Sequence, residues 1–301
     1  MLNSKDLILN EIRKNNLSID SLYIEENNQL EKIIDSNNLH ELRSCSKLLI
    51  ALAAGIAIDK GLLNLEENIA SYFDKYIINN KNRNKIAKWT LRTLLTHTTG
   101  YDKMLMSQKQ ILENNLDTNN LLDYVLNVDI ENEPNSVVVY NNVEPFLVSV
   151  LFKEKLNIDI LEFVKINIFN KLEIIDYKWE KYGEYCPGCT GLYLTPNDFY
   201  KIGKLILNNG RYNDIQIVSS SWVEKMCKKQ VDTPYMVKKE RLFPKNGIGY
   251  YTFISNDGFV FRDGTNGQYV IMNKNKNLLI TIMSSEKEMN KITEIFRNII
   301  M

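Results

Sequence analysis

Alternating apolar and polar positions mark both ends of the chain as rich in β-strands. Near the start, residues 17–24 and 30–34 alternate on either side of the polar stretch 26–29, a pattern typical of a β-hairpin. The last segment, 289–299, carries its apolar residues on one helical stripe, so we expect it to pack on a sheet. Before it, short apolar segments between turn residues predict a meander of strands at 249–254, 259–263, 268–272 and 278–283.

The period changes to that of helices between these two ends. A long apolar helix is predicted at 46–60, which Gly61 ends, and shorter helices are predicted at 91–96, 121–126, 143–155 and 199–207. Two β-rich ends around a helical middle favour an α/β (α+β) fold, in which both termini build one antiparallel sheet with flanking helices. We therefore expect a discontinuous sheet domain, 1–60 and 212–301, and an inserted, mainly helical domain, 61–211.

Composition and charge exclude several classes of protein. The 301 residues carry 37 basic and 37 acidic side chains, so no global positive field attracts nucleic acid or an anionic membrane. The longest apolar run, 48–58, is shorter than the ~20 residues that span a bilayer. The first residues carry charges where a signal peptide needs an apolar core, so we expect a cytoplasmic protein. Two histidines and four cysteines exclude a three-histidine metal site and argue against a disulfide framework.

The segment Ser44-Cys45-Ser46-Lys47 is the first candidate for chemistry. It begins the long apolar helix, where residues three apart share a face, so the Ser44 hydroxyl and the Lys47 amine can meet. A serine hydroxyl becomes a good nucleophile when another group takes its proton, and a lysine can do so when burial lowers its pKa. Free backbone N–H groups at the helix N-terminus can stabilise an oxyanion.

This spacing alone is a weak signal, because Ser284-Ser285-Glu286-Lys287 repeats it near the end of the chain. The two copies differ in the segments downstream of them. Ser44 is followed by Tyr140-Asn141-Asn142, before a predicted helix, and then by Thr265-Asn266-Gly267, before a predicted strand. Ser284 is followed only by the final helix, so Ser44 is the candidate nucleophile.

These three motifs, in this order, resemble those of the serine β-lactamase and penicillin-recognising superfamily, most closely its class C branch with the related esterases and D-peptidases. The likeness covers nearly the whole chain, with further landmarks at 62–67, 89–100, 190–198, 208–210 and 222. The resemblance implies a β-lactamase-like fold and a serine hydrolase that works through an acyl-enzyme, without a metal or organic cofactor.

The resemblance also implies roles for the first two motifs. Ser44 would attack the carbonyl of an ester, amide or lactam. Lys47 and Tyr140 would share the general-base work, with Tyr140 as phenolate or as a proton relay to the leaving group. Asn142 would hold either the substrate carbonyl or the Lys47 side chain.

For the third motif, the resemblance implies binding roles. The backbone N–H groups of Ser44 and Gln268 would form the oxyanion hole, and Thr265 and Gly267 would line the strand edge against which the substrate lies. Related β-lactamases and D-peptidases usually carry a cation or histidine at the position of Thr265, facing the substrate carboxylate. Arg262 would lie on the opposite face of a regular strand, unless a bulge at 263–264 changes the alternation.

The missing cation and the lack of an export signal favour a neutral ester or amide substrate. β-Lactamase or D-alanyl-D-alanine carboxypeptidase activity stays an alternative, as does acyl transfer. A hypothesis from another class is a non-catalytic, penicillin-binding-like or regulatory protein on the same fold. In each case the expected partner is a small molecule rather than nucleic acid or a membrane, and the oligomeric state stays open.

Two further features invite competing interpretations. With Lys47 beside Ser44, we expect His97 to be structural and His40 to face solvent. The sequence Cys186-Pro187-Gly188-Cys189 has the spacing of a redox motif but not its βαβ surroundings, and the resemblance favours a loop beside the active site.

Overall fold

A computed structural model describes residues 5–233 and 246–300, without the side chains of 297–300, and its chain forms two compact units. The sheet unit comprises residues 1–45, 171–178 and 192–301. The helical unit comprises residues 46–170 and 179–191. In the described ranges, no helix is both long enough and apolar enough to cross a membrane.

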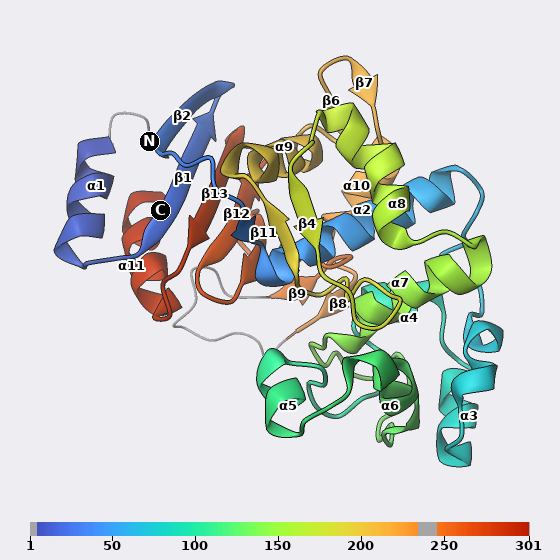
Figure 1. The fold of residues 1–301 in the computed structure, drawn as a ribbon. Coiled ribbons are helices and arrows are strands. Elements are labelled where there is room, and N and C mark those ends of the chain that lie inside the picture. The colour runs from blue at the N-terminus through green and yellow to red at the C-terminus, as the bar shows by residue number, and fades with distance from the viewer. Residues whose placement is uncertain (1–4, 234–245, 301) are drawn as a thin grey trace. The chain divides into compact units, whose positions relative to one another are not determined.

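An antiparallel sheet of eight strands, counted over the described residues, is the frame of the sheet unit (Figure 1). Its order is β2-β1-β13-β12-β11-β10-β9-β8, so the first hairpin lies beside the last strand and both termini build one sheet, as the pattern predicts. The strands are β1 (Ile19–Glu26), β2 (Gln29–Ile34), β8 (Val231–Asp232), β9 (Gly247–Ile248), β10 (Phe253–Ile254), β11 (Val260–Gly264), β12 (Gln268–Asn273) and β13 (Leu278–Ser284).

Turn chemistry sets the ends of these strands. Asn27 and Asn28 join β1 to β2 with φ angles of 53° and 64°, the left-handed geometry of a tight hairpin turn that asparagine tolerates. The prediction of one strand over 249–254 is wrong. Tyr251 is left-handed at φ 55° and the Gly249 N–H donates to the Thr252 carbonyl, so a turn separates β9 from β10.

Helices cover this sheet. The amphipathic α9 (Pro196–Leu207) packs on β12 and β13, and a Cβ at its Gly203 would lie 2.8 Å from Leu279 Cδ1, so a larger residue there would have to displace the Leu279 side chain. The first and last helices, α1 (Lys5–Lys14) and α11 (Met289–Ile300), lie side by side (Figure 1). The sheet unit also contains α10 (Ser220–Met226) and the strand pair β6 (Arg211–Tyr212) and β7 (Ile215–Gln216). A small three-stranded sheet consists of β3 (His40–Glu41), β5 (Leu192–Leu194) and β4 (Tyr177–Trp179). Trp179, the last residue of β4, is assigned to the helical unit.

The helical unit is built around α2 (Lys47–Asp59). This helix is apolar on all sides, which is the pattern of a helix buried at the centre of a unit, and it packs against α7 (Val143–Leu156) and α8 (Ile160–Val164). The remaining α-helices of this unit are α3 (Asn80–Ile86), α4 (Leu91–Leu95), α5 (Gln108–Glu113) and α6 (Leu121–Asn127).

The unit boundaries differ from the expected division at 60/61 and 211/212. Helix α2 lies in the helical unit because its apolar surface packs on α7 and α8. Helix α9 lies in the sheet unit because its apolar stripe packs on β12 and β13.

A buried carboxylate ties α9 to the sheet. Glu25 on β1 is only 1% exposed, and it accepts hydrogen bonds from the Tyr200 hydroxyl and the Lys204 ammonium of α9. Burial, together with this carboxylate, raises the pKa of Tyr200, which therefore stays a neutral donor.

We expect Glu25→Ala to lower the free energy of unfolding by about 3 kcal/mol, because the largely buried Tyr200 hydroxyl loses its acceptor and the Lys204 ammonium keeps Asn28 Oδ1 but loses its carboxylate. Urea denaturation measures this loss. Glu31→Ala is the matched control, because its ion pair with Lys5 is partly exposed and should contribute no more than about 1 kcal/mol. Equal losses in the two variants would contradict the assignment.

Candidate active site

Ser44 and Lys47 belong to one continuous helical run. Ser44 lies in the 3₁₀-helix Arg43–Ser46, which leads directly into α2 at Lys47. Arg43 is left-handed at φ 51°, a conformation that costs a non-glycine residue about 1 kcal/mol or more, and its guanidinium is 2.8 Å from a Glu41 carboxylate oxygen. The residue before the candidate nucleophile is therefore held in a strained conformation.

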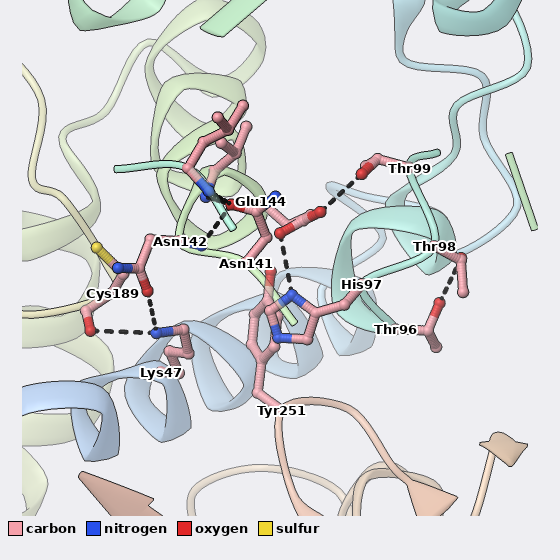
Figure 2. A network of polar contacts seen from close by, with 12 residues as sticks. Lys47, Thr96, His97, Thr98, Thr99, Asn141, Asn142, Glu144, Cys189 and Tyr251 are labelled. Atoms are coloured by element: carbon pink, nitrogen blue, oxygen red, sulfur yellow. Dashed lines mark hydrogen bonds and ion pairs between the residues drawn. The ribbon is translucent and has the colours of Figure 1, made fainter. Parts of the chain in front are cut away.

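Lys47 is completely buried at the start of α2. Its ammonium donates to Asn142 Oδ1 at 2.8 Å and to the Cys189 carbonyl at 3.3 Å (Figure 2). Lys47 Nζ also lies 5.0 Å from the centroid of the Tyr140 ring. The helical unit thus brings together three predicted site residues: Lys47, Tyr140 and Asn142. The resemblance implies that Asn142 holds either the substrate carbonyl or the Lys47 side chain, and the structure contains the bond with Lys47.

The two asparagines after Tyr140 fix the loop beside it. Asn141 accepts the Leu105 N–H and donates to the Lys103 carbonyl, both at 2.9 Å. Asn142 donates its amide group to the Met106 carbonyl at 3.0 Å. Since the amide nitrogen of Asn142 is held in this way, its oxygen is directed at Lys47.

His97 is buried, as expected for a structural residue, but its partner was not predicted. Its Nδ1 lies 3.0 Å from Oε2 of Glu144, and Oε1 of the same carboxylate accepts the Thr99 hydroxyl at 2.6 Å (Figure 2). Both side chains of the His97–Glu144 pair are inaccessible to solvent. The signal in the sequence is an acidic residue in the otherwise apolar start of α7, two positions after Asn142.

His40, expected to face solvent, is instead half-buried. Its ring nitrogen Nε2 lies 3.1 Å from the Ser284 carbonyl oxygen.

In the sheet unit, Arg262 on β11 reaches the backbone of Ser44. Its Nε donates to the Ser44 carbonyl at 3.0 Å and its Nη1 to the Tyr251 carbonyl at 3.3 Å, and its guanidinium lies over the Phe253 ring. The pairing of residues 262–264 with β12 is regular, so there is no bulge. The strand instead ends at Gly264, so Thr265 lies outside it. The alternation of side chains between the two faces of a strand therefore does not apply to Arg262 and Thr265.

The other strand residues lie in different surroundings. Gly264 is next to the Ser44 segment, since a Cβ there would be 2.8 Å from the Leu42 carbonyl oxygen. Thr265, one residue further on, is exposed. A Cβ at Gly267 would meet Ile292 of α11, and the Gln268 amide is bonded to the backbone of Ser284 on β13. The structure therefore brings Arg262 and Gly264 against the Ser44 segment, whereas Gly267 and the Gln268 side chain contact α11 and β13.

The cysteines of the 186–189 loop are buried thiols rather than a disulfide. Burial, and then the nearby Asp159 carboxylate, raise the pKa of the Cys186 thiol to about 12. Cys189 contributes its backbone carbonyl to Lys47. Among the residues that the structure describes, no three His, Cys, Asp or Glu side chains are grouped so that they could hold a metal ion.

Solved structures with the same fold support this arrangement of elements. A proposed 6-aminohexanoate-dimer hydrolase from Bacillus anthracis is 20% identical, with a TM-score of 0.76 over 97% of this chain and 80% of that one. The octameric penicillin-binding protein homologue from Pyrococcus abyssi is 16% identical, with a TM-score of 0.75 over 99% and 76%. EstCE1, a hydrolase with promiscuous acyltransferase activity, is 12% identical, with a TM-score of 0.77 over 98% of both chains.

The fold is thus that of the serine β-lactamase-like hydrolases and penicillin-binding proteins. Residues 31–295 match the family model described as Beta-lactamase, and the chain belongs to this family. Comparison with curated protein sequences finds no match. The expected superfamily and fold class are therefore confirmed.

We expect Arg262→Met to lower the free energy of unfolding by about 3 kcal/mol, because two buried carbonyls lose their charged donor while the packing volume is kept. Urea denaturation measures the effect. Arg92→Met is the control, since the Arg92–Glu66 pair is exposed and should contribute less than about 1 kcal/mol. A loss no larger than that of the control would show that the guanidinium does not brace the Ser44 segment.

The Cys186 thiol should resist alkylation in the folded protein at pH 8, because with a pKa of about 12 only about one molecule in 10⁴ is a thiolate. Peptide mapping after treatment with iodoacetamide measures this, and protein unfolded in urea is the control that should label fully. Rapid labelling of the folded protein, or a bond between Cys186 and Cys189, would restore the redox interpretation.

Proposed function

We propose that this protein is a serine hydrolase that cleaves an ester or amide bond through an acyl intermediate on Ser44. The observation that carries the proposal is the surroundings of Lys47. Its side chain is buried three residues after Ser44, and its Nζ is bonded to Asn142 and lies 5.0 Å from the Tyr140 ring centroid. Membership of the Beta-lactamase family supports the same chemistry.

The proposed reaction has two halves. In the first, Ser44 Oγ forms a bond to the substrate carbonyl carbon, its proton passes to the neutral amine form of Lys47 or to Tyr140 as phenolate, and backbone N–H groups stabilise the oxyanion. The bond to the leaving group then breaks, and the leaving group takes up the proton, with Tyr140 as the relay. In the second half, water attacks the acyl-Ser44 ester, releases the acid and returns the proton to the Ser44 hydroxyl.

A neutral substrate fits the strand residues best. Thr265 stands where the family pattern has a cation, and the guanidinium of Arg262 is bonded to the carbonyls of Ser44 and Tyr251. A substrate carboxylate would therefore gain little from this strand. For this reason we favour an uncharged ester or amide over a penicillin.

Acyl transfer is a variant of the same chemistry. EstCE1, which shares the fold, is described as a hydrolase with promiscuous acyltransferase activity. An alcohol or amine would then replace water as the acceptor of the acyl group, and product analysis with added acceptors distinguishes the two. The non-catalytic alternative would give reversible ligand binding without a covalent adduct.

We expect the wild-type protein to gain the mass of one acyl group when it is mixed with a 4-nitrophenyl ester, as measured by intact-mass spectrometry. Ser44→Ala should show no adduct, and Lys47→Ala should acylate at least about 100-fold more slowly, because the serine loses its proton acceptor. The adduct with a penicillin should form more slowly than the ester adduct.

Ser284→Ala is the matched control, because Ser284 and Lys287 have the same spacing as Ser44 and Lys47. In the structure the Ser284 hydroxyl donates to the Ser18 carbonyl at 2.8 Å, so this serine has a structural partner. The Ser284→Ala variant should therefore be acylated at the same rate as the wild type. An adduct that persists in Ser44→Ala would refute the assignment of the nucleophile, and reversible binding without any adduct would favour the non-catalytic alternative.

A further inference from the structure

The mechanism proposed above assigns no role to the buried pair of His97 and Glu144. Removing a carboxylate from water is costly, and its partners seldom return more than that cost. Glu144 accepts from Thr99 and faces His97 Nδ1, and it lies in the first turn of α7, where the helix dipole favours a negative charge. These contacts stabilise the buried Glu144 side chain, but they do not explain what the His97–Glu144 pair contributes to the protein.

His97 contacts the segment that carries Tyr140 at two points. The imidazole and the Tyr140 ring have their centroids 5.0 Å apart with 51° between their planes. The His97 carbonyl accepts the N–H of Val139, the residue before Tyr140, at 3.0 Å. His97 is itself left-handed at φ 56°, a conformation that a non-glycine residue keeps only where its surroundings enforce it.

The start of α7 orients two groups that lie beside the Tyr140 ring, the Lys47 amine and the His97 imidazole. Asn142, at the N-cap position, holds the Lys47 ammonium, and Glu144, two residues later, holds the His97 imidazole. Because Tyr140 lies three residues before the first residue of α7, one short stretch of chain carries the phenol and fixes these two neighbours.

We infer that His97 is a positioning residue for Tyr140 and that Glu144 orients His97. The inference rests on the proposed function, and within it on Lys47 as the acceptor of the Ser44 proton and Tyr140 as the relay that delivers a proton to the leaving group. One oxygen of Glu144 faces His97 Nδ1 and the other accepts the Thr99 hydroxyl, so the carboxyl group is held from both sides and fixes the plane of the imidazole. The fixed imidazole then holds the Tyr140 ring where its hydroxyl can pass a proton to the leaving group.

The variants Glu144→Gln and His97→Asn test this pair. Glutamine keeps the shape of Glu144 without its charge, and asparagine tolerates the left-handed backbone of His97. Glu154→Gln is the matched control. Glu154 lies on the same helix and accepts from the hydroxyls of Tyr76 and Tyr185, at 2.9 and 3.1 Å, in a cluster that does not include Tyr140. Thermal unfolding confirms that each variant is folded, and Glu144→Gln carries the test if His97→Asn does not fold.

The measurement is the rate of acylation by a phenyl ester and by the 4-nitrophenyl ester of the same acid. We expect both variants to acylate about 10- to 100-fold more slowly than the wild type with the phenyl ester. This is part of the roughly 10²- to 10⁴-fold rate enhancement that a positioned proton-transfer group contributes. The loss should be much smaller with the nitrophenyl ester, since its leaving group departs without a proton. The control should lose little with either ester.

Equal losses with the two esters would overturn the inference, because a smaller fraction of folded protein lowers both rates alike. A loss no greater than that of Glu154→Gln would overturn it as well. A wild-type protein that forms no Ser44-dependent adduct would overturn the proposed function itself, and this inference with it.

Discussion

The burial of one ammonium group constrains much of the helical unit. Lys47 begins a helix in which residues 48–57 are apolar and buried, so its Nζ must be met by polar atoms from outside that helix. The Asn142 side chain and the Cys189 carbonyl meet it, and they come from the start of α7 and from the 186–189 loop. Because α7 also packs along α2, the placement of Tyr140 and Glu144 follows from the same association of helices.

Most of the fold could be predicted from periodicity. The first hairpin, the last three strands of the meander and the long helices have strong apolar patterns, and their bounds agree with the structure to within a few residues. Helix α1 was not predicted, because it is short and largely exposed and buries only Ile8 and Ile12. The strand expected at 249–254 was interrupted by the left-handed Tyr251, which no composition rule identifies.

The candidate site could be predicted only as far as its motifs. The order of the motifs selected Lys47, Tyr140 and Asn142, whose side chains meet in the helical unit, while their catalytic roles stay predictions. The surroundings of Arg262 could not be predicted, because the alternation rule assumes a strand longer than the one that forms. Glu144 was missed because a single acidic residue in an apolar helix resembles an ordinary solvent-facing position until the fold encloses it.

Several residues near the candidate site have a left-handed backbone although they are neither glycine nor asparagine. Over the described residues, fifteen non-glycine positions have positive φ, and ten of them are asparagine, which adopts this conformation at low cost. Four of the other five are Arg43, His97, Met106 and Tyr251, and each precedes, contacts or bonds to a residue discussed above. Glycine or asparagine at these four positions would relieve conformational energy. The four positions therefore lower stability, and under the proposed function thermostabilising selection at them would trade activity for resistance to heat.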